Sequence, residues 1–219
     1  MLEDFEKNTH VTRLEVVDEY ILMRAHEIAE EMRKYLDSFE FGLALGVFER
    51  FFWHDLCDNY LEIIKDRLYN PGKYENGDIA RKSGQYALYH VVLSTLKLVA
   101  PFIPHITEEI YSQFFRESEG EKSIHLLAYE ATGGEKITHS KEELEATMDI
   151  FLDIIEQVRK YKTEKSLKLS TELQTVIITA PEEIIERLRN IENDIRGVTR
   201  ADRVIREIGE NFSVGIEEK

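Results

Sequence analysis

Apolar side chains recur every three or four residues over most of the chain, which is the spacing of amphipathic helices. The pattern predicts one helix from about Leu14 to Leu36 and a longer one from Phe41 to Tyr69, stopped by Asn70-Pro71-Gly72. The aromatic residues of the second helix predict a buried, central position. A buried Trp53 would make its truncation cost roughly 3 to 5 kcal/mol.

A third apolar stripe, from Leu88 to Val99, predicts a helix that Pro101 and Pro104 interrupt, because proline lacks the amide donor. Thr107 is then expected to cap a short helix. That places Glu108 and Glu109 in its first turn, where carboxylates complement exposed amides.

Residues 117–139 carry three glycines among scattered apolar residues, which predicts a linker crossing the bundle. Ser140 and Glu143 predict a capping box at the start of the next helix, which would complete an antiparallel bundle. We therefore expect a mainly α fold, with a helical-bundle domain over residues 1–172.

Beyond Leu169 the pattern changes. Residues 175–179 read as a strand, Pro181 as the first position of a helix that runs to Gly197, and residues 203–208 and 212–216 as two further strands. Three short strands need a helix over one face. Residues 173–219 are thus expected to form a small α/β lobe.

Composition limits the class of protein. The chain has 219 residues, 42% of them hydrophobic, which is enough to bury a full core. Its single cysteine, Cys57, excludes an internal disulfide framework and a multi-cysteine zinc site. No apolar run approaches the ~20 residues that span a bilayer, and the acidic, polar N-terminus is unlike a signal peptide. A soluble, cytoplasmic protein is expected.

The net charge of −15 argues against nonspecific binding to nucleic acid. Positive charge is nevertheless concentrated locally, in three groups that can contact RNA phosphates. The first patch is Arg159, Lys160, Lys162, Lys165 and Lys168; the second patch is Lys65, Arg67, Lys73, Arg81 and Lys82; the third patch is Arg187, Arg189, Arg196, Arg200, Arg203 and Arg206. For any single member, a solvated surface charge is the simpler interpretation.

Tyrosines near the second patch can stack unpaired bases, although a core position is an equal alternative for some of them. They are Tyr69, Tyr74, Tyr86 and Tyr89. Tyr74, which lies in a polar loop, is the favoured stacking residue.

Asp55, Asp58 and Glu62 follow at i, i+3 and i+7, so a regular helix would present three carboxylates on one face. They would suit a hard cation, as in a metal-dependent hydrolase. Pairing with neighbouring basic side chains, such as Lys65 with Glu62, is the preferred interpretation, and no metal site is expected. The sequence also lacks His-Glu-x-x-His, Gly-x-Gly-x-x-Gly, P-loop and Gly-x-Ser-x-Gly motifs, so no catalytic residue is assigned.

Two segments carry a resemblance to a known family. Phe51 to Lys65, FFWHDLCDNYLEIIK, and Ala100 to Tyr111, APFIPHITEEIY, resemble the anticodon-binding region of class I aminoacyl-tRNA synthetases, and the first segment is most similar to the valyl enzymes. Tyr20 stands where that family usually has tryptophan. The signature positions, mostly structural, are Phe52, Trp53, Asp55, Cys57, Asp58, Tyr60, Glu62, Pro101, Pro104, Thr107, Glu108 and Glu109.

The resemblance implies recognition of a tRNA anticodon stem and loop, with valine-specific tRNA as partner. It implies a parent valine–tRNA ligase that uses ATP and Mg²⁺ in a catalytic domain and also has an editing domain. This chain, with no cofactor of its own, is not expected to aminoacylate alone. The missing coiled-coil extension suggests an archaeal-type C-terminus.

One further motif is a false match. Residues 162–166, KTEKS, resemble the loop with which these enzymes stabilise ATP phosphates, but Glu164 would place a negative charge beside them. Two alternatives to the valyl assignment stay open: the same domain of an isoleucyl or leucyl enzyme, and an acidic helical module that binds proteins.

Overall fold

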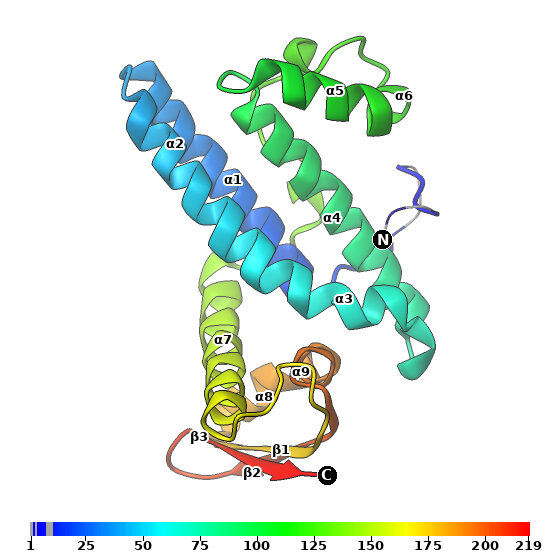
Figure 1. The fold of residues 1–219 in the computed structure, drawn as a ribbon, viewed down its shortest axis with the longest axis vertical. Helices are drawn as coiled ribbons and strands as arrows, with labels where there is room; N and C mark the ends of the chain where they lie inside the picture. Colours follow the sequence, from blue (N-terminus) through cyan, green and yellow to red (C-terminus); the bar gives the residue numbers. More distant parts are fainter. Residues whose placement is uncertain (1, 3, 8–10) are drawn as a thin grey trace.

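The computed structural model describes residues 2, 4–7 and 11–219. It confirms a helical bundle followed by a small α/β lobe (Figure 1). The helices of the bundle are α1 (Val16–Asp37), α2 (Phe41–Arg50), α3 (Leu61–Tyr69), α4 (Gly77–Val99), α5 (Pro104–Phe114), α6 (Arg116–Glu119) and α7 (Lys141–Glu164). The lobe contains β1 (Leu173–Ala180), α8 (Glu182–Arg189), α9 (Glu192–Thr199), β2 (Ala201–Ile208) and β3 (Ser213–Glu218).

The long second helix is continuous, as predicted, but changes its winding. Between α2 and α3, residues Phe51–Tyr60 form a π-helical segment, and the amide of Leu61 donates to the carbonyl of Leu56, five residues back. A π-helix of this length is rare. The inward side of the segment holds Phe51, Leu56 and Tyr60, which are buried.

Trp53 is not in the core. Its side chain is 61% exposed and contacts Phe52, with ring centroids 4.9 Å apart. The expectation that Trp53 is buried is therefore wrong. The helix presents Phe51 inward, and Trp53, two residues further on, lies on the opposite side of the helix.

Helices α1 and α4 form the centre of the bundle, with α1 packed against α2, α4 and α7. Helix α4 begins at Gly77, eleven residues before the predicted stripe, because its polar first turns also find partners in the interior. Ser83, for example, is fully buried, accepts a 2.8 Å hydrogen bond from the Glu15 amide and donates to Asp18.

Helix α5 begins at Pro104 rather than beyond Thr107. The Thr107 hydroxyl donates to the carbonyls of Ile103 and Pro104 at 3.1 Å, so it is a buried residue of the second turn and does not cap the helix. Glu108 and Glu109 consequently lie beyond the first turn. Glu108 instead accepts hydrogen bonds from Ser123 and the Ile124 amide, which fixes the following turn.

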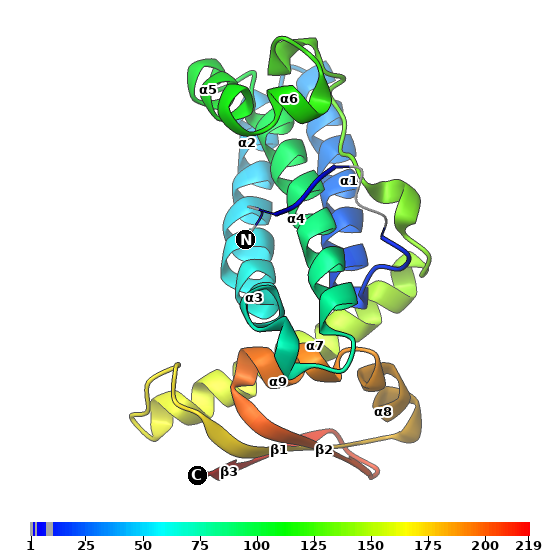
Figure 2. The same ribbon diagram turned by 90° about the vertical axis from the view of Figure 1, so that its right-hand side faces the viewer.

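Residues 117–139 return across the bundle with short turns and little regular structure (Figure 2). The Thr132 amide donates to Ser94 of α4 at 3.0 Å, and the Thr138 amide donates to the buried Glu19 of α1 at 2.8 Å. The predicted capping box then forms: the Glu143 amide donates to the Ser140 hydroxyl, and Glu143 accepts from the Ser140 amide.

Helix α7 departs from a regular antiparallel bundle. Its first half packs on α1, and its second half leaves the lower end of the bundle in Figure 1 to contact α8, α9 and β3. Tyr161 donates a 2.7 Å hydrogen bond to Glu218 of β3. The helix therefore links the bundle to the sheet, and the boundary at residue 172 stays a prediction.

The lobe contains a sheet of order β2-β1-β3, with β1 parallel to β2 and antiparallel to β3. Two helices, rather than the single one predicted to reach Gly197, lie between the sheet and the bundle (Figure 2). Val176 and Ile178 of β1 face them and are fully buried. The same hydrophobic core continues from the bundle helices into this inner face.

No helix in the described part of the chain has both the length and the apolarity to cross a membrane.

Candidate nucleic-acid interface

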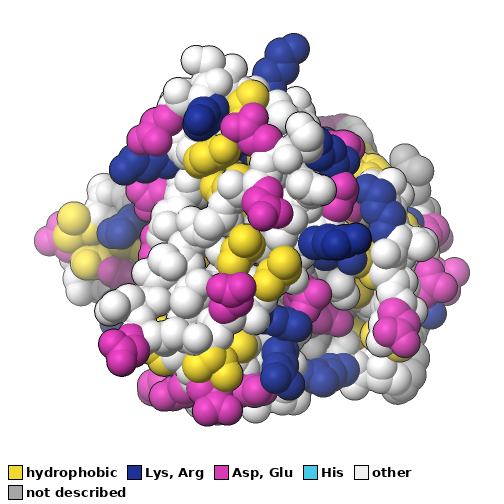
Figure 3. Space-filling view, turned by 90° about the horizontal axis from the view of Figure 1, so that it is seen from below, with side chains coloured by type: hydrophobic (Ala, Val, Ile, Leu, Met, Phe, Trp, Pro, Cys, Tyr) yellow, Lys and Arg dark blue, Asp and Glu magenta, His cyan; other side chains and the backbone are white. Residues whose placement is uncertain are grey.

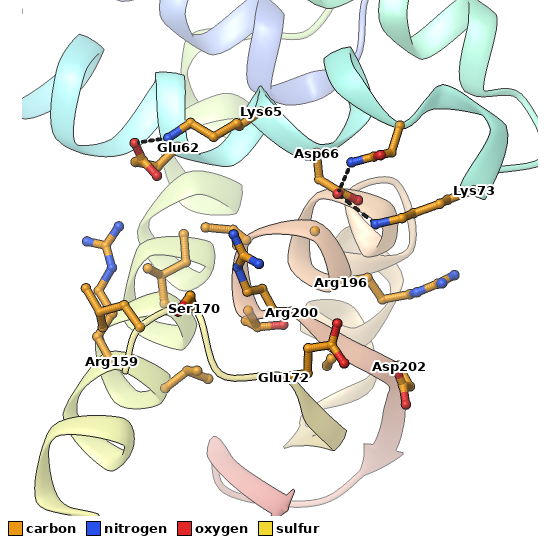
Figure 4. Close-up of a pocket in the computed structure, with 18 of the residues that line it drawn as sticks. Glu62, Lys65, Asp66, Lys73, Arg159, Ser170, Glu172, Arg196, Arg200 and Asp202 are labelled. Carbon is orange, nitrogen blue, oxygen red and sulfur yellow. Dashed lines mark hydrogen bonds and ion pairs between the residues drawn. The ribbon is translucent and has the colours of Figure 1, made fainter. Parts of the chain in front are cut away.

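A cavity of about 800 Å³ lies where α3, α7, α9 and the loop after α7 meet (Figure 4). Its charged and polar lining comes from all three predicted patches and from the intervening loop. The charged members are Glu62, Lys65, Asp66, Lys73, Arg159, Lys162, Glu172, Arg196, Arg200 and Asp202. The cavity thus joins segments that lie up to 140 positions apart in the sequence.

Lys162 shapes one wall of this cavity. Helix α7 ends at Glu164, and Ser166, with φ of 55°, turns the chain back beneath it. The Lys162 ammonium lies inside that turn and donates to the carbonyls of Leu169, Thr171 and Thr199 at 3.1, 2.8 and 2.9 Å. One buried cation therefore holds the loop and the end of α9 together.

Burial lowers the pKa of the Lys162 ammonium, and the nearby Arg200 lowers it further. Three carbonyl oxygens are the partners that a buried lysine needs to stay charged. Because the side chain is 2% exposed and its donors are used, Lys162 is not available to RNA. Its assignment as an RNA contact is wrong.

Arg200 is an exposed cation that lines the cavity. It follows the last residue of α9 with φ of 59°, and its side chain points into the cavity in Figure 4. Its backbone carbonyl accepts a 2.9 Å hydrogen bond from the Leu173 amide, which fixes its position beside β1. No ion pair involves Arg200 among residues 2, 4–7 and 11–219.

Each carboxylate of the cavity binds the ammonium of a lysine. Glu62 pairs with Lys65, and Asp66 pairs with Lys73 at 3.0 Å. Glu172 and Asp202 both bind the ammonium of Lys219, at 2.7 and 3.1 Å.

Asp66 also accepts hydrogen bonds from Tyr74 and Asn70. Burial acts to raise the pKa of Asp66, but the hydrogen bonds from Tyr74, Lys73 and Asn70 outweigh it and leave the pKa below its usual value. Asp66 is therefore ionised, and its oxygens accept hydrogen bonds from these three side chains.

The sign of the local charge is opposite to that of the whole protein. Six lysine and arginine residues and four acids line the cavity, whereas the chain as a whole has 28 basic and 43 acidic residues. On the face seen from below, Lys and Arg side chains are interspersed with Asp and Glu side chains, so the excess of cations is a property of the cavity and not of every surface (Figure 3). A local excess of cations near a concave surface attracts polyanions despite the net charge.

Of the other residues of the first patch, one lines the cavity and three lie on the open surface. Arg159 lines the cavity and donates a 3.3 Å hydrogen bond to the carbonyl of Asp58. Lys160, Lys165 and Lys168 are exposed and lie outside the lining.

The second patch is only partly at the surface. Lys65 and Lys73 line the cavity, and Lys82 is exposed on α4. Arg81 binds Asp4, with one contact of 2.9 Å, and donates to the carbonyl of Leu68.

Arg67 is an internal residue. Its side chain is 3% exposed and lies between Asp18 of α1 and Asp194 of α9, with 3.5 Å from its Nε to the Asp194 carboxylate. Tyr60, of the family signature, donates to the same Asp18 at 2.8 Å. Arg67 thus connects bundle and lobe, and its assignment as an RNA contact is wrong.

Tyr74 is also inside. It is 9% exposed, donates to Asp66, and carries the Arg196 guanidinium 5.7 Å from its ring centre. Its expected role as a stacking residue is wrong, because the side chain is buried and Arg196 already lies over its ring. Tyr86 and Tyr89 are buried in α4, but Tyr69, the last residue of α3, is 61% exposed and lines the cavity.

The third patch contributes Arg196 and Arg200 to the cavity. Its other members are directed elsewhere. Arg187 pairs with Glu183, Arg189 with Glu186 and Arg206 with Glu192, while Arg203 is exposed on β2.

The three carboxylates considered for a metal are separated by their partners. Asp55 binds Arg24 at 3.3 Å and Glu62 binds Lys65, as the pairing interpretation predicts. Asp58 is exposed. In the described part of the chain, no group of three metal-binding side chains forms here or elsewhere.

Ser170, Glu172 and Asp202 line the cavity although no sequence pattern marked them. They arrive there through the turn at Ser166 and the pairing of β1 with β2, in which Leu173 lies opposite Ala201. Polar residues near the end of a strand are common, so these three do not indicate in the sequence that they line a cavity.

Comparison of the sequence with known proteins identifies the family of the chain. A family model described as the anticodon-binding domain of tRNA ligase matches residues 18–177. The chain is 37% identical over 201 residues to the valine–tRNA ligase of Pyrococcus furiosus and 38% identical over 201 residues to that of Pyrococcus horikoshii, which covers 92% of this chain and 21% of each relative. Identity to the valine–tRNA ligase of Thermococcus kodakarensis is 34% over 203 residues, 93% of this chain and 22% of the relative.

The chain therefore spans about a fifth of the length of these relatives. The matches confirm the resemblance carried by Phe51–Lys65 and Ala100–Tyr111. Because the family match covers well over half of the chain, the chain belongs to the family of anticodon-binding domains of tRNA ligases.

Proposed function

We propose that this chain is the part of a valine–tRNA ligase that binds the anticodon stem and loop of valine-specific tRNA. The observation that carries the proposal is the cavity between α3, α7 and α9, where members of three basic segments converge and each acid binds a lysine. Family membership supports tRNA as the partner, and the names of the relatives support valine.

The physical basis is the chemistry of an RNA loop. Unpaired bases of a loop can turn outward, stack on aromatic rings and expose their Watson–Crick edges, while lysine and arginine bind the phosphates and set the register. Arg159, Arg200 and Lys65 lie around one concave surface and suit the backbone of such a loop. Exposed Lys160, Lys165 and Lys168 extend this surface along α7 and the turn after it, and Lys82 lies on α4.

The proposal extends to the parent protein. Its catalytic domain would use ATP and Mg²⁺ to join valine to the tRNA, and an editing domain would accompany it in a cytoplasmic enzyme. This chain would supply binding only, without a cofactor, and would not aminoacylate tRNA alone.

The test is a filter-binding titration of the 219-residue protein with a valine-specific tRNA transcript, at several salt concentrations. We expect binding that weakens as salt rises, because bound phosphates release their counterions when the complex forms. A transcript with a swapped anticodon should bind more weakly. Equal affinity for both transcripts would contradict anticodon recognition, and stronger binding of isoleucine or leucine transcripts in competition would contradict the valine assignment.

A matched pair of charge variants locates the surface. Arg159→Glu reverses a charge that lines the cavity, whereas Lys34→Glu reverses an exposed charge near the end of α1, far from it (Figure 1). We expect only the first to weaken tRNA binding and to reduce the slope of affinity against salt, by about 1 for each lost phosphate contact. An equal loss in both variants would show that the binding follows total charge, not this cavity.

A further inference from the structure

The cavity is large enough for more than phosphate contacts. Its volume of about 800 Å³ falls in the range of roughly 300 to 1,000 Å³ that encloses small-molecule ligands, and a single nucleotide is a ligand of that size. Phosphate contacts need only lysine and arginine side chains at the surface. A cavity of this volume with an exposed aromatic ring and a cation without an ion pair is suited to a whole nucleotide.

Two residues that line the cavity have the chemistry to bind the base and the phosphate of a nucleotide. Tyr69 is 61% exposed at the end of α3, although a tyrosine ring gains by burial, and its exposed part borders the cavity. Arg200 reaches the cavity from the end of α9, below α3 in Figure 4, and has no ion pair in the described residues. The ring offers a stacking surface and the guanidinium offers a phosphate ligand.

The surroundings keep these two groups available. Lys162 fixes the carbonyl of Thr199, directly before Arg200, so the guanidinium is presented from a rigid chain segment. Lys219 binds both Glu172 and Asp202, at 2.7 and 3.1 Å, and so competes with Arg200 for these acids. Ser170 on the loop adds a hydroxyl that can meet a base edge.

We propose that the cavity accepts one unstacked nucleotide of the bound RNA loop, with Tyr69 stacked on its base and Arg200 bound to its phosphate. This inference rests on the proposed function, since the nucleotide belongs to the same RNA. It adds the identity of the stacking residue, and it names the cavity as the place that holds one base turned out of the loop.

The first experiment uses hairpin RNAs with the sequence of a valine anticodon stem-loop and the fluorescent base 2-aminopurine at one loop position at a time. Stacking quenches this base. We expect the wild-type protein to quench one position strongly, Tyr69→Ala to abolish that quenching, and Tyr69→Phe to retain it because the ring is kept. Quenching that persists in Tyr69→Ala would overturn the assignment of Tyr69.

Binding affinity gives a second, independent measure. Loss of one base–aromatic stack should weaken binding of the hairpin by roughly 5- to 100-fold in Tyr69→Ala, and not in Tyr69→Phe. Trp53→Ala is the matched control, because Trp53 is on the same continuous helix, is also 61% exposed, and does not line the cavity. An equal loss in Trp53→Ala would mean that the RNA follows the helix surface instead of entering the cavity.

Arg200→Asn tests the phosphate contact, since asparagine tolerates the positive φ of this position and the variant loses only the charged group. We expect weaker hairpin binding and a salt slope reduced by about 1, with partial recovery in Arg200→Lys. A slope identical to that of wild type would overturn the role of Arg200.

Free nucleoside monophosphates separate a loop nucleotide from a mononucleotide ligand. We expect millimolar AMP or CMP to leave the hairpin bound, and displacement at micromolar concentration would overturn the RNA-loop assignment. The failure of the proposed function is distinct from all these outcomes, because then neither tRNA nor hairpin binds the wild-type protein. Binding without any quenched position would refute the nucleotide site alone.

Discussion

The ammonium of Lys162 donates a 2.9 Å hydrogen bond to the backbone carbonyl of Thr199, the last residue of α9. Two further carbonyls, of Leu169 and Thr171, complete its shell. The end of α7, the loop after it and the end of α9 therefore share one buried charge. Lys162 therefore stabilises the wall of the cavity that carries Arg200.

Lys162→Met keeps most of the aliphatic stem and removes the three donors. We expect it to lower the free energy of unfolding by about 2 to 4 kcal/mol, because three carbonyls lose a charged hydrogen-bond partner. Urea denaturation followed by circular dichroism measures the change. The exposed Lys165→Met should shift the free energy by less than about 0.5 kcal/mol, and equal midpoints for the two variants would contradict the role given to Lys162.

Trp53→Ala should lower the free energy of unfolding by less than about 1 kcal/mol, because the side chain is 61% exposed and leaves no cavity. Phe51→Ala, two residues earlier and 1% exposed, should cost about 3 to 5 kcal/mol. Thermal denaturation of both variants makes the comparison. A larger loss in Trp53→Ala would place the indole in the core.

Ser140→Ala removes one half of the capping box at the start of α7, where the Ser140 hydroxyl accepts from the Glu143 amide. Loss of an N-cap hydroxyl should cost about 1 kcal/mol. Ser38→Ala is the control, since Ser38 follows the end of α1 and its side chain makes no cap there. A calorimetric midpoint that falls equally in both variants would show that the box adds no stability.

Periodicity allowed the helices and strands to be predicted, because burial of one face is a local property of the sequence. Residues 175–179 are all β-branched, and Ser140 and Glu143 stand three residues apart, so both features can be seen in the sequence. The π-helical winding of Phe51–Tyr60 was not visible, since the apolar spacing of this segment fits an α-helix equally well.

The interface was only partly predictable, because a cationic side chain gives no local sign of whether it faces water. Lys162 and Lys165 stand three residues apart on α7 and its end, yet only the first is enclosed by the returning loop. Arg67 and Tyr74 are likewise buried by α9, which lies more than 100 residues further along the chain. Such long-range contacts decide which charges of a patch remain available to RNA.

Asp194 of α9 is one of the buried charges between the bundle and the lobe. Burial disfavours the ionised carboxylate and raises the pKa of Asp194 to about 7, although the adjacent Arg67 opposes this shift. Between the usual value of 3.8 and about 7, the folded protein then binds a proton that the unfolded chain lacks. The stability contributed by Asp194 is therefore complete below the lower pKa and is lost as pH rises to about 7, by about 1.4 kcal/mol per pH unit.

Asp194→Asn isolates this effect, because asparagine imitates the neutral carboxyl at every pH. We expect wild type and variant to have similar unfolding free energies near pH 3.5, and wild type to fall progressively behind up to pH 7, with a constant difference above it. Urea titrations at each pH measure the difference, with the exposed Asp58→Asn as the control variant. A difference that does not change with pH would mean that Asp194 is ionised throughout and that its pairing with Arg67 outweighs the cost of burial.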